Sequence, residues 1–143
     1  AGQRTSIAVS GWDVAGKSAL RHEAMESILR GELNGDISGV SILRSAIGER
    51  KEAIAHTVPL TSQEVQREAE SFFKMTARRF VIGRGSAEGD AQLRVGAFVD
   101  LLGLGPLFNG KYYLTEVRHI FSGARGLLTE FVGERPGLGQ AGR

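Results

Sequence analysis

The sequence predicts an α+β fold, in which a barrel-like antiparallel β-sheet carries one long packed helix. Three observations predict this fold. The second half of the chain alternates apolar stretches with short glycine turns, residues 62–79 show an amphipathic helical pattern, and Gly makes up 20 of the 143 residues. This glycine content is roughly double the usual share. Because the glycines stand singly between apolar stretches, they indicate many turns and not a flexible linker.

The first 60 residues predict short elements. Alternating apolar residues over 4–10 predict a strand, and 11–16 predict a turn. Helical spacing predicts a helix over 17–30 and a short one over 42–47, each followed by a glycine that can end it. Residues 53–60 have the pattern of a strand that a proline stops.

The long helix, from about Ser62 to Arg79, has the clearest signals. Thr61 and Glu64 have the spacing of a capping box. Burial of Phe72 and Phe73 is expected to contribute about 1.5 to 3 kcal/mol each, so the helix should anchor the core by lying on the antiparallel sheet. Its apolar stripe contains Val65, Ala69, Phe72, Phe73, Thr76, Ala77 and Phe80.

Strand patterns follow the helix at residues 93–102, 107–108, 111–122 and 127–134. Asn109-Gly110 favours a two-residue hairpin turn, so the segments on either side of it should pair. Residues 122–126 predict the next hairpin. We expect one domain over 1–135 and a flexible tail or linker over 136–143, where no periodicity is visible.

One motif points to nucleotide binding. Residues 11–18 match the phosphate-loop pattern GxxxxGK[ST] after a predicted strand, and Asp100 could supply a metal-holding carboxylate. Nucleotide folds with this loop use parallel sheets, whereas short hairpins force antiparallel pairing. A P-loop nucleotide-binding protein is therefore the alternative hypothesis, and its cofactor-binding residues would be Gly11, Gly16, Lys17 and Ser18.

Other chemistry has little support in the sequence. The chain has no Cys, and its three histidines, His22, His56 and His119, lack ligand spacing, so we predict no metal site. No serine-nucleophile motif is complete. We therefore expect no catalytic residues, no cofactor and no enzymatic activity. A basic cluster near the helix end should be solvated or salt-bridged, with an interface or a phosphate patch as alternatives; it contains Lys74, Arg78, Arg79, Arg84 and Arg94.

Charge and hydropathy narrow the choice of partners. Lys and Arg number 18 against 16 Asp and Glu, and this net charge of +2 does not indicate a nucleic-acid binder. No apolar run approaches the ~20 residues that span a bilayer, and no secretory signal is visible. The chain starts at Ala1, so we expect a processed product or an excised segment.

A resemblance to a known family covers most of the chain, and several stretches carry it. They are VPLTS at 58–62, Gly85 with EGD at 88–90 and LRVG at 93–96, GLGPLFNGKYYLTEVRH at 103–119, and TEF with ERP at 129–136. They are similar to the late control protein D family of tailed phages. The resemblance implies a structural baseplate hub protein of a phage tail or contractile injection system, akin to the hub part of type VI secretion spike proteins.

The resemblance also implies a tail-tube-like sheet, a homotrimer that links a tail tube protein to a spike protein, and a place in the virion or injection-particle baseplate, assembled in the cytoplasm. It implies a strand at 17–20, where the periodicity favours a helix. The chain would be a C-terminal part of a longer hub. Ring assembly would cover open sheet edges, with the 103–110 loop at the interface, whereas Phe108, Tyr112 and Tyr113 should pack in the core.

Overall fold

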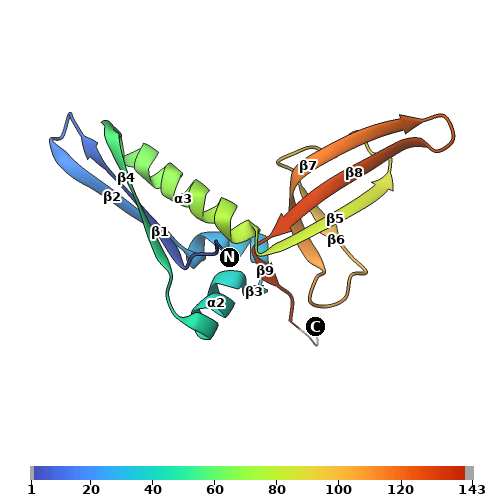
Figure 1. The fold of residues 1–143 in the computed structure, drawn as a ribbon, viewed down its shortest axis with the longest axis horizontal. Helices are drawn as coiled ribbons and strands as arrows, with labels where there is room; N and C mark the ends of the chain where they lie inside the picture. Colours follow the sequence, from blue (N-terminus) through green and yellow to red (C-terminus); the bar gives the residue numbers. More distant parts are fainter. Residues whose placement is uncertain (1, 141–143) are drawn as a thin grey trace.

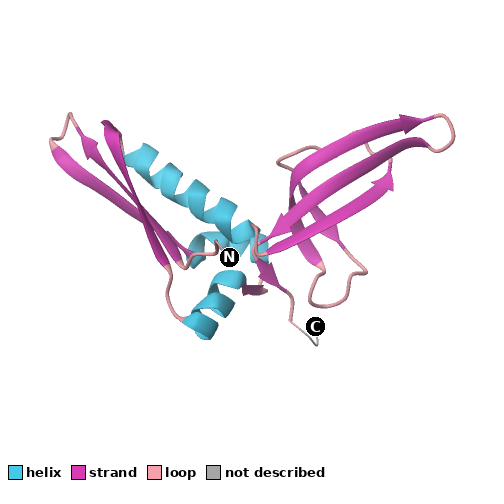
Figure 2. Ribbon diagram, viewed as in Figure 1, coloured by secondary structure: helices cyan, strands magenta, loops and turns pink. Residues whose placement is uncertain are grey.

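The structure is a computed structural model that describes residues 2–140, and it is an α+β structure made mostly of strands (Figure 2). Its two larger sheets lie at opposite ends of the molecule (Figure 1). The α+β class is confirmed. The expectation of one long helix is wrong, because three α-helices lie within the described residues, and two of them are short.

The first sheet has the strand order β2-β1-β4. Strand β1 (Ser6–Asp13) pairs antiparallel with β2 (Ser18–Met25) and parallel with β4 (Lys51–Pro59). The parallel pair departs from the all-antiparallel prediction. It is possible because the chain between β1 and β4 is long enough to return to the same end of the sheet.

The helix predicted over 17–30 is wrong. That segment forms β2, then a 3₁₀ turn, η1 (Glu26–Leu29), and the short α1 (Arg30–Leu33). Leu20 and Ala24 satisfy a period of two as well as a helical period, so the local pattern is ambiguous. Residues 18–25 pair with β1 along their whole length, and this pairing stabilises the strand. A strand here is the alternative that the sequence analysis left open.

Strand β3 (Ile37–Ser38) leads directly into α2 (Gly39–Ile47). The Ser38 hydroxyl accepts a hydrogen bond from the Ser41 N–H at 2.9 Å and so caps the helix. Gly48 ends α2 with a φ of 81°, as predicted. At Gly39 a Cβ atom would lie 2.3 Å from the Phe80 ring, so a glycine is required there for close packing.

Helix α3 (Ser62–Arg78) begins at the predicted cap, where the Thr61 hydroxyl accepts from the Glu64 N–H at 3.2 Å. It covers one face of the first sheet and not the antiparallel sheet of the second half (Figure 1). This placement corrects the prediction. Strands β1 and β2 supply the apolar side chains that α3 buries; the core contains Ile7, Val9, Ala24, Leu29, Leu33, Val40, Val65, Ala69, Phe73 and Ala77.

The two phenylalanines of α3 differ in burial. Phe73 is fully buried, whereas Phe72 is 37% exposed, so the predicted burial of both is half wrong. Phe73 follows Ala69 by four residues and precedes Ala77 by four, which puts these three on one face of the helix. Phe72 lies about 100° away around the axis.

The second sheet is antiparallel, with the order β5-β8-β7-β6. Its strands are β5 (Val81–Glu88), β6 (Phe98–Leu101), β7 (Gly110–Ser122) and β8 (Gly126–Arg135). The hairpin predicted at 122–126 is confirmed. Strand β5 was not predicted, because Gly83 and Gly85 interrupt its apolar pattern. All four strands contribute to one apolar pocket, so the sheet is curled.

The hairpin predicted at Asn109-Gly110 is wrong. Residues 102–109 form a longer loop that joins β6 to β7, and 107–108 is not a strand. The Asn109 side chain accepts from the Leu104 N–H at 2.7 Å, and its own N–H donates to the Gly105 carbonyl at 2.9 Å. Asn109 therefore closes this loop. Gly110 has a φ of 140° and starts β7.

The chain end is not the flexible tail that the sequence predicts over 136–143. Pro136 is buried, and β9 (Gly137–Leu138) pairs with β3. The Gly139 N–H donates to the Leu107 carbonyl at 2.9 Å. Because this segment directly follows β8, it lies beside β3 and pairs with it. A stretch without local periodicity thereby forms a strand. Residues 141–143 lie outside the described part of the chain.

Candidate functional site

The phosphate-loop segment is a β-hairpin. It contains the four residues of the nucleotide hypothesis, Gly11, Gly16, Lys17 and Ser18, and β2 follows the loop where a phosphate site needs a helix. The Asp13 carboxylate accepts hydrogen bonds from the N–H groups of Ala15 and Gly16, at 3.0 and 3.1 Å. A carboxylate of the chain itself therefore accepts hydrogen bonds from two backbone N–H groups of the loop that a phosphate would need. The nucleotide-binding alternative is wrong, and its motif match is an Asx turn.

The histidines lie apart, and each has its own polar neighbour. His22 and His56 lie 3.9 and 2.7 Å from glutamates of α3, and Nδ1 of His119 lies 2.8 Å from the Thr129 hydroxyl oxygen. Asp100 is exposed on β6. Within residues 2–140, no group of three or more His, Cys, Asp or Glu side chains could hold a metal ion.

Arg78, from the predicted basic cluster, is salt-bridged. Its Nε and Nη2 atoms donate to the two carboxylate oxygens of Glu32 at 3.0 and 2.5 Å. Its guanidinium carbon lies 3.9 Å from the centre of the Tyr113 ring, which packs edge-on against Phe98. Arg78 thereby joins α3 and α1 to the second sheet.

Arg135, at the end of β8, is the most deeply buried charged side chain of the described residues, with 1% exposure. Its Nη2 donates to the Asp36 carboxylate, and Nη1 lies 3.5 Å from the Leu107 carbonyl. Sequence reasoning missed this pair because 99 positions separate the partners. A Cβ on Gly110 would lie 2.6 Å from Nη2, so this glycine makes room for the guanidinium.

Tyr112 packs beside Arg135 and is buried, as predicted. Its hydroxyl donates to the Phe108 carbonyl at 2.7 Å. Burial raises the pKa of Tyr112 above its ordinary value, and the neighbouring Arg135 charge opposes part of this increase. The folded state therefore favours the neutral phenol.

This raised pKa predicts a loss of stability in alkaline solution. The contribution of Tyr112 is fully present below its unfolded pKa of about 10. It is lost as the pH rises through the higher folded pKa, because the unfolded chain releases the proton first. Urea unfolding across this pH range should show a steeper decline for the wild type than for Tyr112→Phe. Equal slopes for the two proteins would contradict the assignment.

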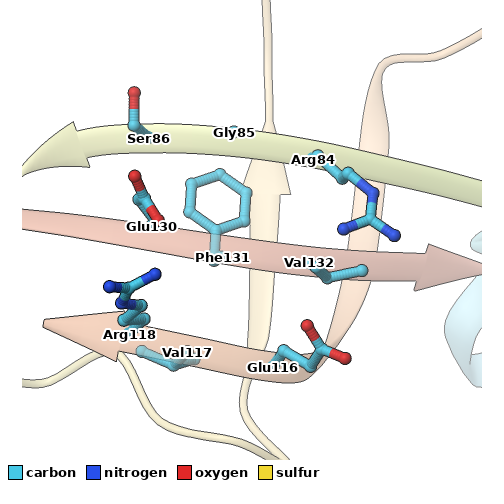
Figure 3. Close-up of a pocket in the computed structure, with 9 residues that line it drawn as sticks. All are labelled: Arg84, Gly85, Ser86, Glu116, Val117, Arg118, Glu130, Phe131 and Val132. Atoms are coloured by element: carbon cyan, nitrogen blue, oxygen red, sulfur yellow. The ribbon is translucent and has the colours of Figure 1, made fainter.

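An open depression of about 630 Å³ lies on the second sheet (Figure 3). Arg84 and Arg118 line it together with Glu116 and Glu130, so its charges balance. Arg118 faces Glu130 across the β7–β8 pair. The depression therefore has no excess charge of either sign to attract a phosphate or nucleic acid.

The second sheet exposes apolar side chains and open edges. Within residues 2–140, strands β5 and β6 each pair on one side only, and Phe121 is 81% exposed. Phe108 is also exposed, so its predicted place in the core is wrong. Large apolar side chains exposed on this sheet and its loops are Ile82, Val95, Phe98, Leu102, Leu104, Leu107, Phe108, Phe121 and Leu127.

No helix within the described residues is both long and apolar enough to cross a membrane. This finding concerns the helices of residues 2–140 alone.

Comparison with known proteins gives one family. A family model described as Alg8 N-terminal domain matches residues 1–122. No curated protein matches the chain. The match contradicts the predicted membership in the late control protein D family, and with it the baseplate-hub function and the assignment to a phage or injection particle. The implied tube and spike partners and the baseplate location rest on that resemblance alone.

The stretches that carry the resemblance lie partly in loops and partly in strands β7 and β8. The longest stretch begins with residues 103–109, which form the β6–β7 loop, and 89–97 connects β5 to β6. Gly, Asn and Pro recur in such loops because of the φ values that turns require. Similar loop residues therefore distinguish families poorly.

Proposed function

The chain belongs to the Alg8 N-terminal domain family. We propose that it is a non-catalytic assembly module that joins copies of itself through its second sheet. The family description names a domain and no reaction. The proposal therefore rests on the geometry of the sheet.

The proposal rests on one difference between the two sheets, which is whether a helix covers their apolar side chains. In the first sheet, α3 covers β1 and β2 and buries the main core. In the second sheet, the four strands enclose few fully buried apolar residues, chiefly Tyr112 and Leu114. No helix formed by residues 2–140 covers either face of this sheet (Figure 1). Apolar surface and unpaired backbone groups at sheet edges both favour contact with another chain.

The side-chain chemistry favours assembly over catalysis. Ser86 lines the depression on the second sheet, and none of its lining residues in the described part of the chain is a histidine. Arg78 is paired with Glu32, and the buried Arg135 is paired with Asp36. The second pair joins the end of β8 to the first half of the chain. Each pair thus has a structural role.

Assembly would also extend the curled sheet. Its outer strands, β5 and β6, are the positions at which another strand could be added. Addition there would bring the sheet closer to the barrel-like form that the sequence predicts.

The test is the mass of the whole chain in solution. Light scattering should give a mass that rises with concentration from the 15.4 kDa of the monomer to a whole multiple of it. A mass of one chain throughout the micromolar range, up to the solubility limit, would overturn the proposal.

A further inference from the structure

We infer that β5 is the contact strand, and that two copies pair through it in antiparallel orientation about a two-fold axis at Ser86. This inference rests on the proposed function and specifies its contact. In this arrangement, β5 of a second copy pairs with the open edge of β5.

The backbone of β5 presents one free edge. The Gly89 N–H donates to the Leu127 carbonyl at 2.8 Å, and β5 pairs with β8 without a bulge. Because hydrogen-bonding groups alternate along an antiparallel strand, the odd-numbered residues of β5 face β8. The even-numbered residues direct their N–H and C=O groups away from β8; they are Ile82, Arg84, Ser86 and Glu88.

The free edge is accessible. The side chains of Arg84, Ser86 and Glu88 are exposed. Neither Arg84 nor Glu88 forms an ion pair within residues 2–140. The odd-numbered residues Gly83 and Gly85 carry no side chain, so nothing bulky at these positions hinders the approach of a second strand.

Charge selects the register of the pair. With Ser86 opposite Ser86 of the partner subunit, Arg84 lies directly opposite Glu88 of the partner subunit, and symmetry forms the same pair a second time. Opposite charges in directly facing positions stabilise an antiparallel pair. A shift that centres the axis on Arg84 would place two arginines face to face, and centring it on Gly85 would pair neither charge with its opposite.

This pairing creates one continuous sheet from two copies, with the order β6-β7-β8-β5 followed by its mirror order in the partner. It also removes one exposed edge from each chain, which an isolated copy leaves open to aggregation. A two-fold contact of this kind produces dimers.

A charge swap tests the register. Arg84→Glu and Glu88→Arg each place like charges opposite each other twice, so each should raise the dissociation constant of the dimer at least about tenfold. The double variant Arg84→Glu/Glu88→Arg restores both pairs and should return the constant to within about threefold of the wild type. Both side chains are exposed, so each variant should fold, and circular dichroism of each monomer would check this.

A disulfide provides a second measurement. The native chain has no Cys, so Ser86→Cys gives a single thiol at the proposed axis. Directly facing, hydrogen-bonded residues have Cα atoms about 5.5 Å apart, a distance that a disulfide can bridge. Mild oxidation should yield a covalent dimer, whereas Ser71→Cys, exposed on α3, should not.

The outcomes separate the two proposals. If the wild type self-associates while the single charge variants match it and Ser86→Cys does not cross-link, the β5 inference is overturned and the assembly function stands. If the wild type stays monomeric, the assembly function fails, and the β5 contact fails with it.

Discussion

Replacement of Arg135 by Met is expected to lower the free energy of unfolding by about 3 kcal/mol. Removal of one partner from a buried ion pair costs about 3–5 kcal/mol, because the other charge is left uncompensated. The Asp36 side chain is 20% exposed, so water relieves part of this penalty and places the effect at the low end. Chemical denaturation followed by circular dichroism would measure the change.

The double variant Arg135→Met/Asp36→Leu separates charge from packing. It removes both charges together, so it should recover a large part of the lost stability. Arg125→Met, in the exposed β7–β8 turn, is the matched control and should change stability little. Equal effects of Arg125→Met and Arg135→Met would contradict the role of the buried pair.

A loss of about 3–5 kcal/mol is likewise expected for Phe73→Ala, because Phe73 is fully buried between α3 and the first sheet. The cavity left by the ring adds to the loss of apolar burial. For a chain of this size, such a change amounts to a large fraction of the total stability. Thermal unfolding of the variant should show a markedly lower midpoint.

Phe72→Ala is the matched control, since it is the neighbouring residue with the same chemical change. Its ring is partly exposed and alanine favours the helix, so we expect a loss of about 1 kcal/mol. Similar losses for the two variants would mean that α3 is rotated about its axis relative to the described packing.

Local signals predicted several elements correctly. The cap at Thr61 starts α3, Gly48 ends α2, and the turn at 122–126 joins β7 to β8. Each signal acts within a few residues, through a hydrogen bond or a permitted φ value. The same kind of signal misled at Asn109-Gly110, because the β6–β7 pairing places that dipeptide at the end of a longer loop.

The candidate site was harder to predict than the fold. The phosphate-loop motif is a genuine sequence match, yet Asp13 binds the backbone groups that a phosphate would need. Strand β5, which forms the proposed contact, has no clear apolar alternation because Gly83 and Gly85 stand where apolar side chains would be expected. Its open edge depends on where β8 pairs, and no local pattern encodes that pairing.

The sequence by itself determined the α+β class, the long capped helix and the β7–β8 hairpin, because neighbouring residues supply the hydrogen bonds and periodicity that these elements need. Only the tertiary structure decided that 18–25 is a strand, that α3 covers the first sheet, and that Arg135 pairs with Asp36. These outcomes depend on contacts between distant segments. Their free energy comes from burial and pairing across the fold, which outweigh local preference.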